Sequence, residues 1–121
     1  MKYLLLLTNE ADEIASWDEL SEGEQKRLRE EEIPRWNDLF AYMQEKGAWL
    51  DGLELQLPRD ARTVRVRDGE TIVTDGPYAE TKEQIGGFFL VEADNLDEAI
   101  DLAKRVPVVT KASVEIRPLV Q

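Results

Sequence analysis

Two apolar, strand-like segments flank a mid-chain motif that reads Thr74-Asp75-Gly76-Pro77-Tyr78-Ala79-Glu80-Thr81-Lys82-Glu83-Gln84-Ile85-Gly86-Gly87. Pro77 fixes its own φ angle and restricts Gly76 to extended conformations, which favours a turn. Residues 81–84 are tolerable helix formers, and Gly86 is typical of a helix end. The motif therefore predicts a capped turn with a short helix, placed between two strands.

A β-hairpin is predicted immediately before this motif. Asp68-Gly69 separates two alternating segments, 63–67 and 70–74, and this dipeptide favours a two-residue type I′ turn. The resulting register pairs Arg67 with Glu70. The valines of the two strands are then expected on one common face.

Asp75 admits two interpretations. Its carboxylate can accept hydrogen bonds from the amides that follow it, as an Asx turn or N-cap. It also lies two residues beyond Val73, so a continuing strand would direct it to the same apolar side. A carboxylate beside an aromatic residue in a pocket is a setting in which pKa values shift and chemistry occurs. The sequence leaves both a structural cap and a functional group open.

The remaining elements follow from apolar spacing and capping residues. Apolar runs at 3–7 and 87–92 predict strands with apolar residues on both faces, with a polar loop over residues 9–20 after the first. Further strands are expected at 48–56, where Gly52 suggests a bulge, and at 113–117.

Two helices are expected. The first begins at a capping box formed by Ser21 and Glu24 and ends near Gly47, and Pro34 either kinks it or starts a second segment. Its buried stripe is expected to be Trp36, Leu39, Phe40 and Met43. The second follows Asn95 and ends before Pro107. Its buried stripe is expected to be Leu96, Ala99, Ile100, Ala103 and Val106.

The order of these elements, β–α–β–hairpin–β–α–β, predicts an α+β fold. Right-handed crossovers would give a ferredoxin-like βαββαβ sheet with two helices on one face and an inserted hairpin. Two helices leave the other apolar face of the sheet uncovered, and such a face normally marks an interface. We therefore predict a homodimer, with two sheets face to face as a dimeric α/β barrel that contains a cleft.

Composition excludes several classes of function. The 121 residues point to one domain, and 15 basic against 26 acidic residues give 15 − 26 = −11, a charge that opposes nucleic acids and anionic membranes. Without Cys or His there is no thiol nucleophile, no Ser-His-Asp triad and no H-E-x-x-H zinc site. No calcium-loop or phosphate-loop motif occurs, so neither a metal nor a cofactor is predicted. The first apolar run is too short for a signal peptide, which predicts a cytoplasmic protein.

The segment from Thr74 to Phe88 resembles the signature of the YCII-related, or DGPF-domain, proteins. The flanking segments Thr63-Val64-Arg65, Asn95-Leu96-Asp97-Glu98-Ala99 and Val114-Glu115-Ile116-Arg117-Pro118 also fit, so the resemblance covers nearly the whole chain. It implies a single YCII-related domain over 1–121 and a dimeric α/β barrel of ferredoxin-like subunits. It also implies a functional link to an extracytoplasmic-function sigma factor in bacteria.

The chain departs from this family at two positions that bear on chemistry. The resemblance implies a pocket with a His–Asp pair, but Lys111-Ala112-Ser113 stands where a His commonly precedes Gly-Ser, and Tyr78 replaces a Phe. We predict ligand-binding roles for Asp75, Tyr78, Glu80 and Lys111. Asp75 is the candidate catalytic base if burial raises its pKa, and Lys111 the candidate electrostatic stabiliser.

Three functions remain open from the sequence. The first is a homodimeric small-molecule-binding or regulatory module, which fits the cleft and the absence of His. The second is a cofactor-free enzyme of the dimeric α/β barrel kind that uses Asp75 in proton transfer. The third is a purely protein-interaction module without a ligand. The choice rests partly on fold analogy.

Overall fold

The computed structural model describes residues 1–120. In chain order, the helices and strands are β1 (Lys2–Glu10), α1 (Ala11–Asp18), α2 (Glu22–Lys46), β2 (Trp49–Glu54), the 3-10 helix η1 (Pro58–Asp60), β3 (Arg62–Arg67), β4 (Glu70–Asp75), β5 (Glu83–Glu92), α3 (Leu96–Ala103), the 3-10 helix η2 (Pro107–Thr110) and β6 (Val114–Pro118). Four strands form an antiparallel sheet in the order β2-β5-β1-β6, and β3 and β4 form a separate two-stranded sheet. Because β5 inserts between β1 and β2, the larger sheet has the predicted ferredoxin-like topology. None of the described helices is long and apolar enough to span a lipid bilayer.

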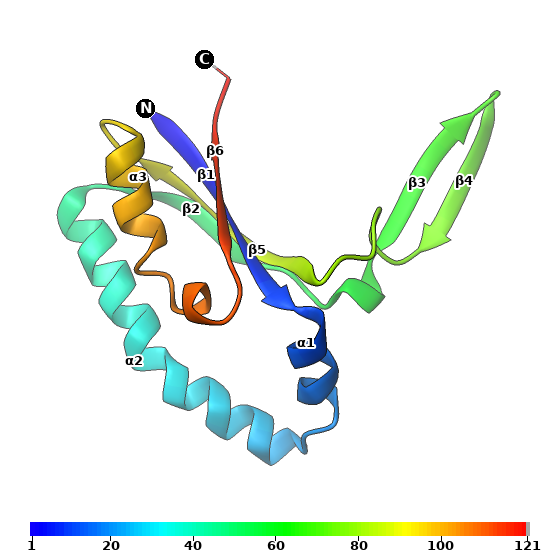
Figure 1. Ribbon diagram of the computed structural model, residues 1–121, viewed down its shortest axis with the longest axis horizontal. Helices are drawn as coiled ribbons and strands as arrows, with labels where there is room; N and C mark the ends of the chain where they lie inside the picture. The colour runs from blue at the N-terminus through cyan, green and yellow to red at the C-terminus, as the bar shows by residue number, and fades with distance from the viewer. Residues whose placement is uncertain (121) are drawn as a thin grey trace.

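One face of the four-stranded sheet carries the core. Leu5 of β1 lies opposite Phe89 of β5 and Ile116 of β6, while Tyr3 lies opposite Val91. Helices α2 and α3 lie on this face (Figure 1) and contribute buried side chains to the same cluster. The prediction of two helices on one face of the sheet is confirmed.

The opposite face of this sheet is also apolar. Strand alternation places Leu4 and Leu6 of β1 there, opposite Leu90 and Phe88 of β5, and all four side chains are partly exposed. On β2, Leu53 lies opposite Phe88 and is largely exposed. The uncovered apolar face expected from the sequence is therefore present in the single chain.

Helix α2 begins as predicted and continues through its proline. The Ser21 side chain accepts a hydrogen bond from the Glu24 amide at 3.2 Å, and the Glu24 carboxylate accepts one from the Ser21 amide at 3.2 Å. Pro34 lies inside one unbroken helix, whose axis bends (Figure 1), because proline removes a backbone hydrogen bond and its ring clashes with the preceding turn. The helix ends at Gly47, which has a φ of 67°.

The polar loop predicted over residues 9–20 is wrong. Strand β1 continues to Glu10, which pairs with Glu83, and α1 follows directly. Asp12 and Glu13 lie in the first turn of α1, where acidic side chains interact favourably with the helix dipole. The polar composition concealed both elements, and the end of β1 is supported by pairing with the distant strand β5.

The short helix predicted at residues 81–85 is also wrong, and Gly86 does not end a helix. Strand β5 starts at Glu83, because this segment continues the ladder along β1. The pairing passes from Leu7 opposite Gly87 to Thr8 opposite Ile85, so Gly86 occupies a bulge. A side chain at Gly86 would collide with the amide of Asn9. The strand register and the Asn9 side chain, not a helix end, account for the place of this glycine.

The β3–β4 hairpin has the predicted register. Thr63 lies opposite Thr74 and Arg67 opposite Glu70, with the turn at Asp68 and Gly69. The hairpin extends away from the rest of the chain (Figure 1). Its valines at 64, 66 and 73 are exposed, unlike the valine in β5.

Two details of the flanking elements correct the sequence expectations. The irregular pairing in β2 falls between Trp49 and Asp51, so Gly52 is not the bulge; it lies directly opposite a β5 residue. In α3, Leu96 and Ile100 are about half exposed rather than buried. The buried stripe there includes Leu102 in their place, which rotates the inward face of the helix.

Candidate functional site

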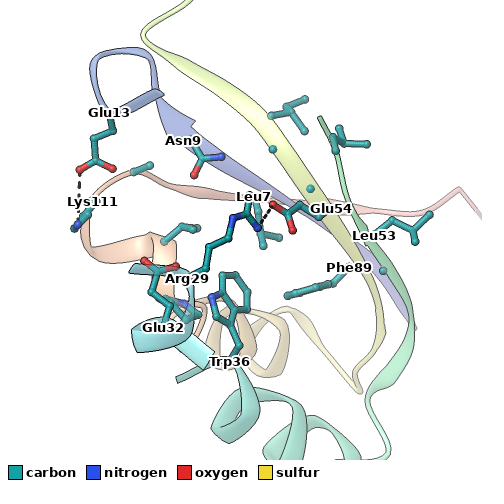
Figure 2. Close-up of a pocket in the computed structure, with 18 of the residues that line it drawn as sticks. Leu7, Asn9, Glu13, Arg29, Glu32, Trp36, Leu53, Glu54, Phe89 and Lys111 are labelled. Atoms are coloured by element: carbon teal, nitrogen blue, oxygen red, sulfur yellow. Dashed lines mark hydrogen bonds and ion pairs between the residues drawn. The ribbon is translucent and has the colours of Figure 1, made fainter. Parts of the chain in front are cut away.

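A groove opens on the helix-covered side of the sheet, where the first half of α2 diverges from the strands. It has a volume of about 740 Å³ and receives side chains from α1, α2, β1, β2, β5 and the η2 segment (Figure 2). The bend of α2 at Pro34 places residues of its first half over this opening. A cavity of this size suits a small organic ligand, for which pockets span about 300–1,000 Å³.

The inner wall of the groove is a cluster of four aromatic rings. Trp36 and Phe40 of α2 approach Phe89 of β5 edge-on, at centroid distances of 6.2 and 5.9 Å. Trp49 of β2 closes the cluster, at 5.3 Å from Phe89 and 5.4 Å from Phe40. All four residues line the groove. The cluster therefore offers a rigid apolar surface on which a flat ligand would pack.

Charged side chains surround the mouth of the groove. The Arg29 guanidinium lies 3.3 Å from a Glu54 carboxylate oxygen and 5.5 Å from the centre of the Trp17 ring. On the η2 side, the Lys111 ammonium lies 3.9 Å from Glu13. Figure 2 shows Arg29 reaching from α2 towards Glu54 on β2. Both ion pairs are solvent-exposed, so each contributes only about 0–1 kcal/mol and is easily opened.

The polar floor of the groove follows from the close contact of β1 and β5. Asn9 lies over Gly86 and lines the groove together with Gln84. Thr8, next to it, shares a hydroxyl contact of 3.0 Å with Ser113 and accepts a hydrogen bond from the Ser113 amide at 3.0 Å. These bonds fix the start of β6 beside β1. Among residues 1–120, no cluster of three or more acidic side chains is arranged to hold a metal ion.

The structure places only one of the four sequence-predicted site residues at this groove. Lys111 lines it, whereas Asp75, Tyr78 and Glu80 are not among the described residues that form its wall. Asp75 shares a hairpin face with Val73, as predicted, but its side chain is 89% exposed and pairs with Arg62 at 3.1 Å. The Asp75 carboxylate therefore takes part in an exposed ion pair within the hairpin.

Tyr78 and Glu80 lie on the segment that links the hairpin to β5. Tyr78 is 78% exposed, and its backbone carbonyl accepts a hydrogen bond from Arg65 at 3.4 Å. Glu80 is exposed as well. Within the single chain, these side chains are therefore open to solvent and apart from Lys111.

Sequence reasoning did not identify Trp17, Arg29 or Glu54 as site residues. A signal for Arg29 was present: it lies seven positions before Trp36, and this spacing puts both on one helix face. The apolar stripe of α2 was assigned to the core, which is confirmed for Leu39 and Met43. No sequence pattern connects β2 with α1, so their meeting at the groove depends on the fold.

The fold and the groove together define a ferredoxin-like domain with an inserted hairpin and an aromatic-walled cavity. A family model described as the YCII-related domain matches residues 1–121, and the chain belongs to this family. It is similar to an uncharacterized protein of Rhizobium meliloti (strain 1021), with 51% identity over 61 residues. That match spans 49% of this chain and 49% of the relative, so about half of each protein is compared.

Proposed function

We propose that this protein is a homodimeric small-molecule-binding or regulatory module whose ligand site is the aromatic groove. The observation that carries the proposal is the combination of a four-ring wall with exposed, weakly held ion pairs at the mouth. Apolar walls with a few convergent polar groups are the usual composition of small-molecule sites. Family membership supports the fold and leaves the ligand open.

The chain carries its own reporter for ligand binding. All three of its tryptophans, Trp17, Trp36 and Trp49, line the groove. Benzyl alcohol, a neutral and soluble aromatic probe, should therefore change the tryptophan fluorescence in a saturable way. The variant Trp36→Leu should weaken this binding while Trp17 and Trp49 still report it. A fluorescence change that never saturates would contradict the proposal.

The homodimer part of the proposal is supported by two apolar surfaces outside the groove. One is the uncovered sheet face formed by Leu4, Leu6, Phe88 and Leu90. The other is the exposed valine face of the β3–β4 hairpin, and an isolated two-stranded hairpin is marginally stable in water. A second copy that covers both surfaces would remove them from solvent and support the hairpin.

Sedimentation analysis at micromolar concentration tests the dimer. The parent protein should sediment as a dimer, and Leu6→Lys should sediment as a folded monomer, because it places a charge on the uncovered face. Leu96→Lys is the matched control, since Leu96 is exposed on α3 and faces away from this surface. A parent protein that is monomeric at this concentration would refute the dimer.

Proton transfer by Asp75 and a purely protein-interaction role are the alternative functions. Nothing in the groove involves Asp75, so the enzyme alternative requires a second chain to bring the hairpin to a pocket. The exposed valines favour the interaction alternative if the groove proves unable to bind ligands. A cytoplasmic location and a link to an extracytoplasmic-function sigma factor stay predictions from the sequence.

The variant Asp75→Asn separates a catalytic from a structural role for this carboxylate. If Asp75 is a base, turnover of any identified substrate should be lost while the free energy of unfolding is unchanged. If it serves only the hairpin, ligand binding should be unchanged and stability should fall by at most about 1 kcal/mol. Arg62→Gln, which removes the partner of Asp75, is the control for the structural effect.

A further inference from the structure

The charges that line the groove balance one another, unlike those of the whole chain. Among residues 1–120, three carboxylates and three cationic side chains contribute to the lining, whereas the chain as a whole carries a charge of −11. The carboxylates are Glu13, Glu32 and Glu54, and the cations are Arg29, Arg35 and Lys111. A ligand with a single charge would be opposed by half of these groups. A ligand that carries both charges would find a partner for each.

The pair formed by Arg29 and Glu54 is the best placed to receive such a ligand. It connects α2 with the end of β2 at the mouth of the groove, near the aromatic wall that includes Trp36 and Phe89 (Figure 2). The two side chains are 61% and 70% exposed, so separating them costs little. A zwitterion inserted between them leaves neither side chain unpaired. Its carboxylate accepts hydrogen bonds from the Arg29 guanidinium, and its ammonium donates to Glu54.

The aromatic wall selects the rest of the ligand. A zwitterion that holds both charges at Arg29 and Glu54 would direct its side chain towards the four rings. Flat side chains gain most from such a surface, through stacked and edge-to-face contacts. Arg29 already lies over the Trp17 ring, and this cation–π contact holds the guanidinium in place while it binds a carboxylate.

We propose that the groove binds a small aromatic zwitterion of the α-amino acid type, with its ring against the aromatic wall and its two charges between Arg29 and Glu54. This inference rests on the proposed small-molecule function and specifies the class of ligand. It requires only the exchange of one intramolecular ion pair for two intermolecular ones. No charge is transferred and no bond is broken in the process.

Three probes that differ only in charge test this inference. L-phenylalanine carries both charges, 2-phenylethylamine lacks the carboxylate, and 3-phenylpropanoate lacks the ammonium. Titrations followed by tryptophan fluorescence, excited where these probes do not absorb, give the three dissociation constants. L-phenylalanine should bind about tenfold more tightly than either analogue, since each lost charged hydrogen bond costs roughly that factor.

Two variants identify the residues that recognise the charges. Arg29→Gln and Glu54→Gln should each weaken L-phenylalanine binding by about five- to tenfold more than they weaken the binding of uncharged benzyl alcohol. Arg67→Gln and Glu70→Gln, on the exposed hairpin, are matched controls that should change neither. Circular dichroism of all four variants verifies that they are folded.

The possible results separate the two proposals. If benzyl alcohol binds but either analogue binds as tightly as L-phenylalanine, the assignment of a zwitterionic ligand is wrong. The small-molecule site itself then stands. Equal binding of 3-phenylpropanoate and L-phenylalanine likewise overturns the inference, because the ammonium is then not recognised. If no probe binds in a saturable way, both the ligand class and the groove as a ligand site are refuted.

Discussion

The four-stranded sheet and the β3–β4 hairpin contain similar strands in opposite surroundings. In the sheet, Leu5 and Val91 are fully buried beneath two helices. In the hairpin, Val64 and Val66 are 61% and 59% exposed, although both are apolar strand residues on one face. An apolar run identifies the sheet strands and alternation identifies the hairpin strands, but the packing partner determines whether an apolar side becomes core.

This contrast explains why the first part of the most recognisable motif, from Asp75 to Glu80, does not mark the groove. The segment from Asp75 to Glu80 joins the hairpin to the sheet, and its special backbone demands serve that junction. Gly76 has a φ of 96°, and its amide donates to the Ala61 carbonyl at 2.8 Å. Thr63 also donates to the Gly76 carbonyl at 2.8 Å. This first part of the motif closes the base of the hairpin, whereas residues 84–87 at its end line the groove.

Truncation of one apolar side chain in each region should have the largest effect. Leu5→Ala should lower the free energy of unfolding by about 2–5 kcal/mol, because it leaves a cavity in the core. Val66→Ala should change it by less than about 0.5 kcal/mol if the hairpin is solvated. Urea denaturation measures both. A loss above about 1 kcal/mol for Val66→Ala would show that a second chain covers the hairpin.

Glycine substitutions compare a crowded backbone position in the sheet with an open position in α2. A Cβ atom at Gly52 would lie 2.5 Å from the Phe89 ring and 2.9 Å from a backbone oxygen, so Gly52→Ala should cost about 1–3 kcal/mol. Within residues 1–120, Gly23 in α2 has no neighbour within 4 Å of such an atom. Gly23→Ala should therefore stabilise the protein by about 0.5–1 kcal/mol through helix propensity. Equal melting temperatures for the two variants would contradict this distinction.

Asp101 on α3 and Asp75 in the hairpin both form ion pairs, and substituting them should give the smallest difference in stability between the two regions. This difference should depend on pH. The Tyr42 hydroxyl donates to Asp101 at 2.6 Å, and this bond, followed by those from Arg105 and Lys104, lowers the pKa of the Asp101 carboxyl below its ordinary value. The stabilisation is therefore present above the ordinary pKa of about 4 and is lost as the pH falls towards the lowered one.

Thermal unfolding at several pH values measures this contribution. Asp101→Asn should melt below the parent protein at neutral pH, and the difference should shrink as the pH falls below about 4. Asp75→Asn, which removes one exposed ion pair in the hairpin, should change the melting temperature less at neutral pH. A difference for Asp101→Asn that stays constant down to strongly acidic pH would contradict the assigned role of this carboxylate.

Much of the fold was predictable because its signals are local. The capping box at Ser21, the Asp-Gly turn of the hairpin and the apolar runs of β1 and β5 each act within a few residues. The failures share a different cause. Residues 9–20 and 81–85 look like a loop and a helix in isolation, yet they extend one strand pair and lead into α1. Long-range pairing overrode local preference at residues 9–10 and 83–85, whereas α1 is a local helix that the polar composition concealed.

The candidate site was less predictable than the fold. Lys111 was identified through the family resemblance, and the structure places it at the groove with Glu13. Arg29 and Glu54 are 25 positions apart, and each is an ordinary surface charge in its own segment. Their contact exists because the fold brings the first half of α2 and the end of β2 to the same groove. Spacing along the chain carries no information about such a pair.

The sequence by itself determined the element types, the hairpin register, the ferredoxin-like order and the uncovered apolar face. Periodicity, caps and turn residues act over short distances, so they can be recognised without knowing what packs against them. The tertiary structure alone decided that the aromatic stripe of α2 is half core and half groove wall. It also decided that Asp75 lies outside the groove. Both outcomes depend on which distant segments come together, because burial belongs to packed surfaces and not to single segments.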